Sequence, residues 1–271
     1  MVAVRPTEAH GRKNLPCHKI APPCATDSHS VPPRSRSSDA RRPLGVIALT
    51  GCDGSGKSTL AAKLVARLRE QGPTEPLYLG QSSGRIAEWI GTLPLIGPSF
   101  NRYLVRKSER VHDRPSTPPG NLTALVIYLL SRWRVHKFRR MLAMCRRGVL
   151  VVTDRYPQAE IPGFRFDGPQ LAKTTGGNGW VRRLRAHEKK LYEWMAASVP
   201  MLVIRLNVDA ETAHARKPDH ALEALREKIA AWPNLRFNGA RILDLDARDD
   251  AGAILDASLR EARALLRSAR P

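Results

Sequence analysis

The stretch GCDGSGKST, residues 51–59, decides the fold of this chain. It follows the apolar run LGVIALT (residues 44–50) and precedes the amphipathic run LAAKLVARLRE (residues 60–70), so the order is strand, glycine-rich turn, helix. Glycines let successive N–H groups of such a turn point at one anion, and the helix N-terminus adds partial positive charge. The spacing of Gly51, Gly56, Lys57 and Ser58 therefore indicates a phosphate-binding P-loop.

The residues of the P-loop are expected to bind ATP and Mg²⁺. The ammonium of Lys57 is expected to reach the β- and γ-phosphates, and the hydroxyl of Ser58 is expected to bind Mg²⁺. The loop residues expected to bind ATP are Gly51, Asp53, Gly54, Ser55, Gly56, Lys57, Ser58 and Thr59.

A second metal ligand is expected where another apolar run ends. GVLVVTD, residues 148–154, ends in Asp154, and an acid there can hold Mg²⁺ opposite Ser58. Arg155 follows at once, and its guanidinium can bind phosphate through two hydrogen bonds without losing its charge. We expect Asp154 and Arg155 to lie at the same sheet edge as the P-loop.

A basic segment, RKPDH at residues 216–220, interrupts a helical pattern with two cations and a proline. We expect a lid at about residues 214–222, which would place Arg216 and Lys217 on the ATP phosphates. An arginine so placed contributes about 10³–10⁵ in rate, and closure excludes water as a competing acceptor. The expected catalytic residues are therefore Lys57, Arg155 and Arg216.

Strands and helices alternate along the chain. Further strands are expected at residues 76–80, 201–208 and 240–247, helices at 121–147, 180–197, 209–215, 221–232 and 250–268, and a loop at 156–179. This alternation predicts an α/β protein of the P-loop NTP hydrolase fold, with a five-stranded parallel sheet covered by helices on both faces and a small lid. Residues 1–43, rich in Pro, Ser and Arg, are expected to be a disordered tail, and residues 44–271 the folded domain.

Composition limits the partners and the compartment. The net charge of +20 predicts affinity for polyanions. The four cysteines are scattered and form no disulfide framework, which favours a reducing compartment. No apolar run is long enough to span a membrane, and no signal peptide is visible. We therefore expect a cytoplasmic protein that does not contact membranes.

The order of these motifs resembles that of thymidylate kinases and, more broadly, of the P-loop nucleoside-monophosphate kinases. The resemblance covers about residues 44–265 and rests on GxDGSGKST, on the RG-strand-DRY pattern ending at residues 154–156, and on an Arg-bearing lid after the fourth strand. It implies ATP-dependent phosphorylation of a nucleoside monophosphate, with dTMP as the best candidate acceptor, and a role in nucleotide biosynthesis.

The resemblance also implies a set of acceptor-binding residues. Asp53 matches an acid that faces the acceptor sugar, and Arg155 matches the arginine that holds the acceptor phosphate and the transferring group. Arg134 matches an arginine that contacts the acceptor base, and Arg85 is the nearest match to one that binds the acceptor phosphate. Tyr156 of the DRY motif completes the expected substrate site.

The chain departs from the family pattern around the base. Leu130 stands where an aromatic residue stacks on thymine, with Tyr128 or Trp133 as substitutes nearby. The Ser and Gln that usually follow DRY are missing. The adenine of ATP is expected near Ala247 and Arg248. The resemblance therefore supports the phosphoryl-transfer machinery and leaves the base pocket open.

Two classes of function fit the sequence. The first is the nucleotide kinase, with a nucleoside monophosphate, a nucleoside or a small alcohol as acceptor. The second is a nucleic-acid-dependent ATPase, which would use the charge of +20 to hold a polyanion. It would need a Glu near Asp154 to activate water, but TDRYP offers Arg155, so the kinase is favoured and nucleic acid is not. A homodimer formed through the long helix that starts at Asn121 is possible.

Overall fold

The structure, a computed structural model, describes residues 44–81, 119–218 and 221–268. The expected tail at residues 1–43 and the expected acceptor residue Arg85 lie outside the described residues. The strands are β1 (Leu44–Gly51), β2 (Thr74–Tyr78), β3 (Leu150–Asp154), β4 (Pro200–Asn207) and β5 (Ile242–Asp246). The helices are α1 (Lys57–Arg69), α4 (Asn121–Arg146), α5 (Gly179–Ala196), α6 (Ala210–Arg216), α7 (Leu222–Ala231) and α8 (Ala251–Ser268).

The five strands form one parallel sheet in the order β2-β3-β1-β4-β5. β1 lies in the centre, and Leu49 pairs with Asp154 of β3 on one side and with Ile204 of β4 on the other. Parallel strands end at a common edge, so this register brings the loop after β1 beside the end of β3. The predicted α/β fold with a five-stranded parallel sheet is confirmed.

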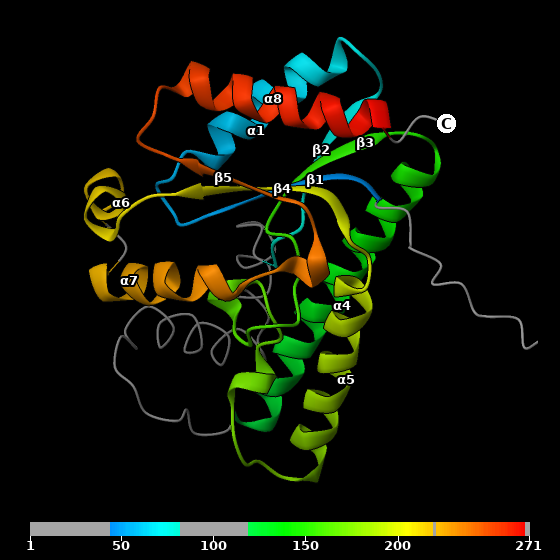
Figure 1. The fold of residues 1–271 in the computed structure, drawn as a ribbon. Coiled ribbons are helices and arrows are strands. Elements are labelled where there is room, and N and C mark those ends of the chain that lie inside the picture. Colours follow the sequence, from blue (N-terminus) through cyan, green and yellow to red (C-terminus); the bar gives the residue numbers. More distant parts are fainter. Residues whose placement is uncertain (1–43, 82–118, 219–220, 269–271) are drawn as a thin grey trace, which may run out of the picture. The chain divides into compact units, whose positions relative to one another are not determined.

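Helices cover both faces of the sheet. α1 and α8 pack together on one face, and α4 and α5 pack together on the other (Figure 1). The central strands are buried on both faces, with Ile47, Ala48, Leu202 and Val203 fully inaccessible. This continuous burial explains why their sequences are apolar runs without alternation, as is typical of parallel strands.

Most helix ends lie where the sequence predicts them. The side chain of Asp209 accepts a hydrogen bond from the Thr212 N–H at 2.7 Å and so caps α6. Gly148 has φ of 77°, in the left-handed region, just after Arg147, the C-cap of α4. By contrast, β2 begins two residues earlier than predicted, at Thr74, because its hydrogen bonds to β3 start there.

The expected loop at residues 156–179 is more ordered than its Gly and Pro content indicates. It contains two short 3₁₀ helices, η1 (Phe164–Phe166) and η2 (Leu171–Lys173). The buried side chain of Gln158 donates to the carbonyls of Ile161 and Phe166, and accepts from the N–H groups of Glu160 and Ile161. One side chain thus satisfies backbone groups that a strand would otherwise pair.

Within the described residues, no helix has both the length and the apolar character that crossing a membrane requires.

The central strands should carry much of the stability of the fold. Leu202→Ala removes a fully buried side chain from β4, so we expect the free energy of unfolding to fall by about 2–5 kcal/mol. Leu129→Ala, at a half-exposed site on α4, should change it by no more than about 0.5 kcal/mol. Urea unfolding followed by circular dichroism measures both, and equal losses would contradict the assignment of the core.

Candidate functional site

The P-loop joins the centre of the sheet to the N-terminus of α1. Gly54 and Gly56 adopt φ of 88° and 85°, conformations that side chains disfavour. A Cβ at Gly54 would lie 2.8 Å from the carbonyl oxygen of Ala213, so a larger residue there would force α6 away from the loop. These glycines therefore maintain both the curl of the loop and its contact with the segment that precedes the expected lid.

Lys57 bridges the loop in this structure. Its side chain is 8% exposed, and its ammonium donates to the carbonyl of Cys52 at 2.6 Å. Burial, together with the nearby ammonium of Lys228, lowers the pKa of Lys57 to about 8, although Asp154 and Asp53 oppose this shift. The ammonium thus lies among like charges as well as carboxylates, and an incoming anion would raise its pKa.

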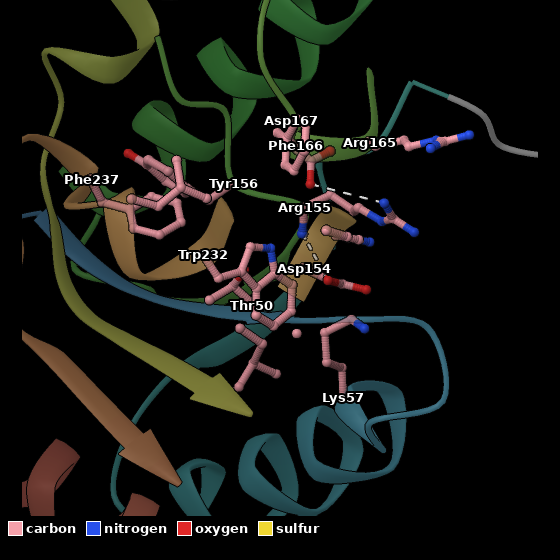
Figure 2. Close-up of a pocket in the computed structure, with 14 residues that line it drawn as sticks. Thr50, Lys57, Asp154, Arg155, Tyr156, Arg165, Phe166, Asp167, Trp232 and Phe237 are labelled. Carbon is pink, nitrogen blue, oxygen red and sulfur yellow. Dashed lines mark hydrogen bonds and ion pairs between the residues drawn. The ribbon is translucent and has the colours of Figure 1, made fainter. Parts of the chain in front are cut away.

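A cleft of about 320 Å³, including the open solvent at its mouth, lies at the carboxyl edge of β1 and β3 (Figure 2). Its wall combines basic and acidic side chains with aromatic ones. The residues that line it are Leu49, Thr50, Gly51, Lys57, Asp154, Arg155, Tyr156, Arg165, Phe166, Asp167, Lys228, Trp232, Leu235 and Phe237. Two of the three expected catalytic residues, Lys57 and Arg155, therefore face the same space.

Arg155 takes an unusual backbone conformation at the end of β3, with φ of 62°. Its N–H donates to the carboxylate of Asp154 at 2.8 Å, and its guanidinium donates to Asp53 at 3.0 Å. Burial by itself would lower the pKa of the Arg155 guanidinium, but the carboxylates of Asp167 and Asp53 raise it. The guanidinium is therefore held charged in the cleft, next to the P-loop.

Arg134 lies behind the cleft and is not among the residues that line it. Its side chain is almost fully buried, and it donates to the backbone carbonyl of Arg155, to the carboxylate of Asp167 at 3.1 Å and to the hydroxyl of Tyr192 at 3.4 Å. The contact with the acceptor base that the resemblance implies for Arg134 stays a prediction. In this structure Arg134 supports the backbone that presents Arg155.

A buried polar network continues from Arg134 between α4 and α5. The hydroxyl of Tyr192 also accepts from the amide of Gln81 at 2.8 Å, and that amide donates to Ser131 at 3.1 Å. The Ser131 hydroxyl donates to Glu188 at 2.7 Å. Burial raises the pKa of Glu188, although its hydrogen bonds oppose the shift. The sequence gives no signal for this network, because its members are far apart in the chain.

The remaining expected residues take other positions. Tyr156 lines the cleft with its ring, while its hydroxyl donates to the Ser198 carbonyl. The guanidinium of Arg216 donates to the carbonyls of Gly54 at 3.4 Å and Ala247 at 3.1 Å, which places it against the P-loop and not in the wall of the cleft. Lys217 is exposed at the C-terminus of α6.

Sequence reasoning missed Lys228, which is a buried lysine of α7 that lines the cleft. Its ammonium lies 3.4 Å from the carboxylate of Asp53 and 5.9 Å from the ring centroid of Trp232. α7 carries other charged residues at similar spacing, so only the way the helix faces the P-loop distinguishes Lys228 from them.

Ser58 and Asp154 fit a Mg²⁺ ion by their chemistry. Both offer oxygen atoms, and Mg²⁺ usually binds one or two protein oxygens together with water and substrate phosphates. In the described ranges, no group of three or more His, Cys, Asp or Glu side chains could hold a metal ion. Burial raises the pKa of Asp154, and Lys57 and Arg155 oppose the shift. A Mg²⁺ ion bound here would neutralise phosphate charge.

The fold and the site define an α/β protein of the P-loop class. The defining features are the parallel sheet, the glycine-rich loop after its central strand and the acid at the end of the adjacent strand. No family model matches the chain. The chain is 65% identical to the Escherichia coli K12 protein YghS over 224 residues, 83% of this chain and 94% of YghS. It is 40% identical to YghR of the same strain over 212 residues, 78% of this chain and 84% of YghR.

The chain therefore belongs to the family of YghS and YghR, each of which is named as an uncharacterized ATP-binding protein.

If Arg134 supports the backbone of Arg155, removing the Arg134 side chain should lower the stability of the fold. Arg134→Met leaves Asp167 without its buried guanidinium partner, so we expect the free energy of unfolding to fall by about 3–5 kcal/mol. Arg140→Met, at an exposed position of the same helix, should change it by about 0.5 kcal/mol or less. Urea unfolding compares the two variants, and similar values would contradict the supporting role.

Proposed function

We propose that this protein is a phosphotransferase that moves the γ-phosphoryl group of ATP to a small acceptor. A nucleoside monophosphate is the proposed class of acceptor, and dTMP is the first one to test. The observation that carries the proposal is the meeting of Lys57 and Arg155 in one cleft at the end of β1 and β3. The names of YghS and YghR support ATP as the donor.

The proposed roles follow from charge and position. Lys57 binds the β- and γ-phosphates, and Arg155 neutralises charge on the transferring group and on the acceptor. A monophosphate is already anionic at neutral pH, so its oxygen needs no strong base before it attacks. Catalysis then depends on positioning and on charge neutralisation.

The residues that line the cleft support transfer of the phosphoryl group to an acceptor over hydrolysis of ATP by water. Its described lining contains two carboxylates and no Glu. One of them, Asp154, accepts the N–H of Arg155, and the other, Asp167, is paired with Arg134. Asp154 is also the expected Mg²⁺ ligand, so the described lining offers no separate Glu beside it to activate water, as an ATPase would require.

Lys57→Ala should abolish acceptor-dependent ADP release without unfolding the protein, because it removes the ammonium from the phosphate site. A coupled ADP-release assay over a panel of nucleoside monophosphates, nucleosides and small alcohols, with and without DNA, measures this. Lys63→Ala on the exposed face of α1 is the matched control and should retain activity.

Each outcome of that panel is informative. ADP release that depends on a small acceptor supports the proposal, and release that depends only on DNA contradicts it. Wild-type turnover by folded Lys57→Ala would show that the site is assigned to the wrong residue.

Arg216→Ala should lower kcat more than it weakens ATP binding. In the structure its guanidinium lies on the P-loop carbonyl of Gly54, from which it could reach the phosphates when they are bound. We expect a loss of at least about tenfold in kcat. Steady-state kinetics with varied ATP separate the two effects. A change confined to KM for ATP would place Arg216 outside the transition state.

A further inference from the structure

We infer that Lys228 is a substrate-binding residue, which forms with Arg155 a clamp for the anionic group of the acceptor, and that Asp53 holds this clamp together before the acceptor binds. The inference rests on the proposed function. It names a residue that no sequence motif identifies, and it states which part of the proposed acceptor, the phosphate or a similar anionic group, that residue binds.

In the structure the two cations of the clamp already contact a carboxylate of the protein, that of Asp53. One carboxylate oxygen of Asp53 lies 3.0 Å from the Arg155 guanidinium, and the other lies 3.4 Å from the Lys228 ammonium. Two cations from distant segments, the end of β3 and the middle of α7, thus bind two oxygens of one anionic group. A guanidinium and an ammonium bind two oxygens of a phosphate by the same chemistry.

The burial of Lys228 distinguishes its contact with Asp53 from an ion pair on the protein surface. Its side chain is 8% exposed, whereas Arg226 on the same helix is half-exposed and pairs with Glu211 and Glu223. Taking an ammonium out of water is costly unless it is compensated. The carboxylate of Asp53 balances the charge of Lys228 only in part, because the same carboxylate is also paired with the guanidinium of Arg155.

The cleft brings several basic side chains close to one another. Lys57, Arg155, Arg165 and Lys228 line it together with Asp154 and Asp167, while Asp53 lies between Arg155 and Lys228, and Glu227 pairs with Arg165. Lys228 is, after burial, the largest cause that lowers the pKa of Lys57, so the two ammonium groups repel each other. An anion that enters the cleft relieves this repulsion, whereas a neutral alcohol does not.

Lys228→Met tests the clamp. The monophosphate with the highest ADP release, starting with dTMP, is compared with its own nucleoside as a neutral competitive inhibitor. We expect KM for the monophosphate to rise at least about tenfold, while KM for ATP and the inhibition constant of the nucleoside change less than about twofold. Lys228→Arg should restore most of the loss, because it keeps the charge.

Arg226→Met is the matched control on α7 and should leave all of these constants within about twofold, because its ion pairs are exposed.

The outcomes separate this inference from the proposed function. If no acceptor stimulates ADP release by the wild-type protein, the proposed function fails. If the wild type phosphorylates a monophosphate and folded Lys228→Met does so with the same KM, the clamp is overturned. Equal weakening of monophosphate and nucleoside binding without rescue by Lys228→Arg also overturns it, because Lys228 would then have a structural role alone.

Discussion

The pairing of β1 with β3 is the constraint on which the rest of the structure depends. Because Leu49 lies beside Asp154, the P-loop that follows β1 and the Asp154-Arg155 pair that ends β3 reach the same edge of the sheet. The apolar central strands are buried between helices on both faces of the sheet, and this packing holds the pairing in place. Fold and site are thus determined by the same packing.

Once the strands meet, electrostatics shape the site. Cations reach it from α1, from the end of β3 and from α7, and the carboxylate of Asp53 joins two of them, Arg155 and Lys228. The ammonium of Lys57 turns to a carbonyl of its own loop. Protein groups therefore satisfy these cations in the positions where we propose that phosphates bind, and a substrate would replace contacts that the protein already makes.

Support for the site extends into the helices on one face of the sheet. Arg134 of α4 holds the backbone of Arg155, and the buried hydroxyl of Tyr192 on α5 accepts from Arg134 in turn. A left-handed residue such as Arg155 persists when its surroundings over-determine its conformation. Here a buried guanidinium and the carboxylate of Asp154 hold the backbone on either side. The packing of α4 against α5 is in this way linked to the geometry of the cleft.

The sequence by itself determined the P-loop, the parallel sheet, the approximate ends of its helices and the presence of Asp154 and Arg155 at its edge. Each of these depends on neighbouring residues, through hydrophobic patterning, turn chemistry and the shared edge of parallel strands. Only the tertiary structure decided the positions of Arg134 and Lys228. Both are basic residues of amphipathic helices, and the packing of their helices against the end of β3 and the P-loop, which no local pattern encodes, separates them from the exposed cations beside them.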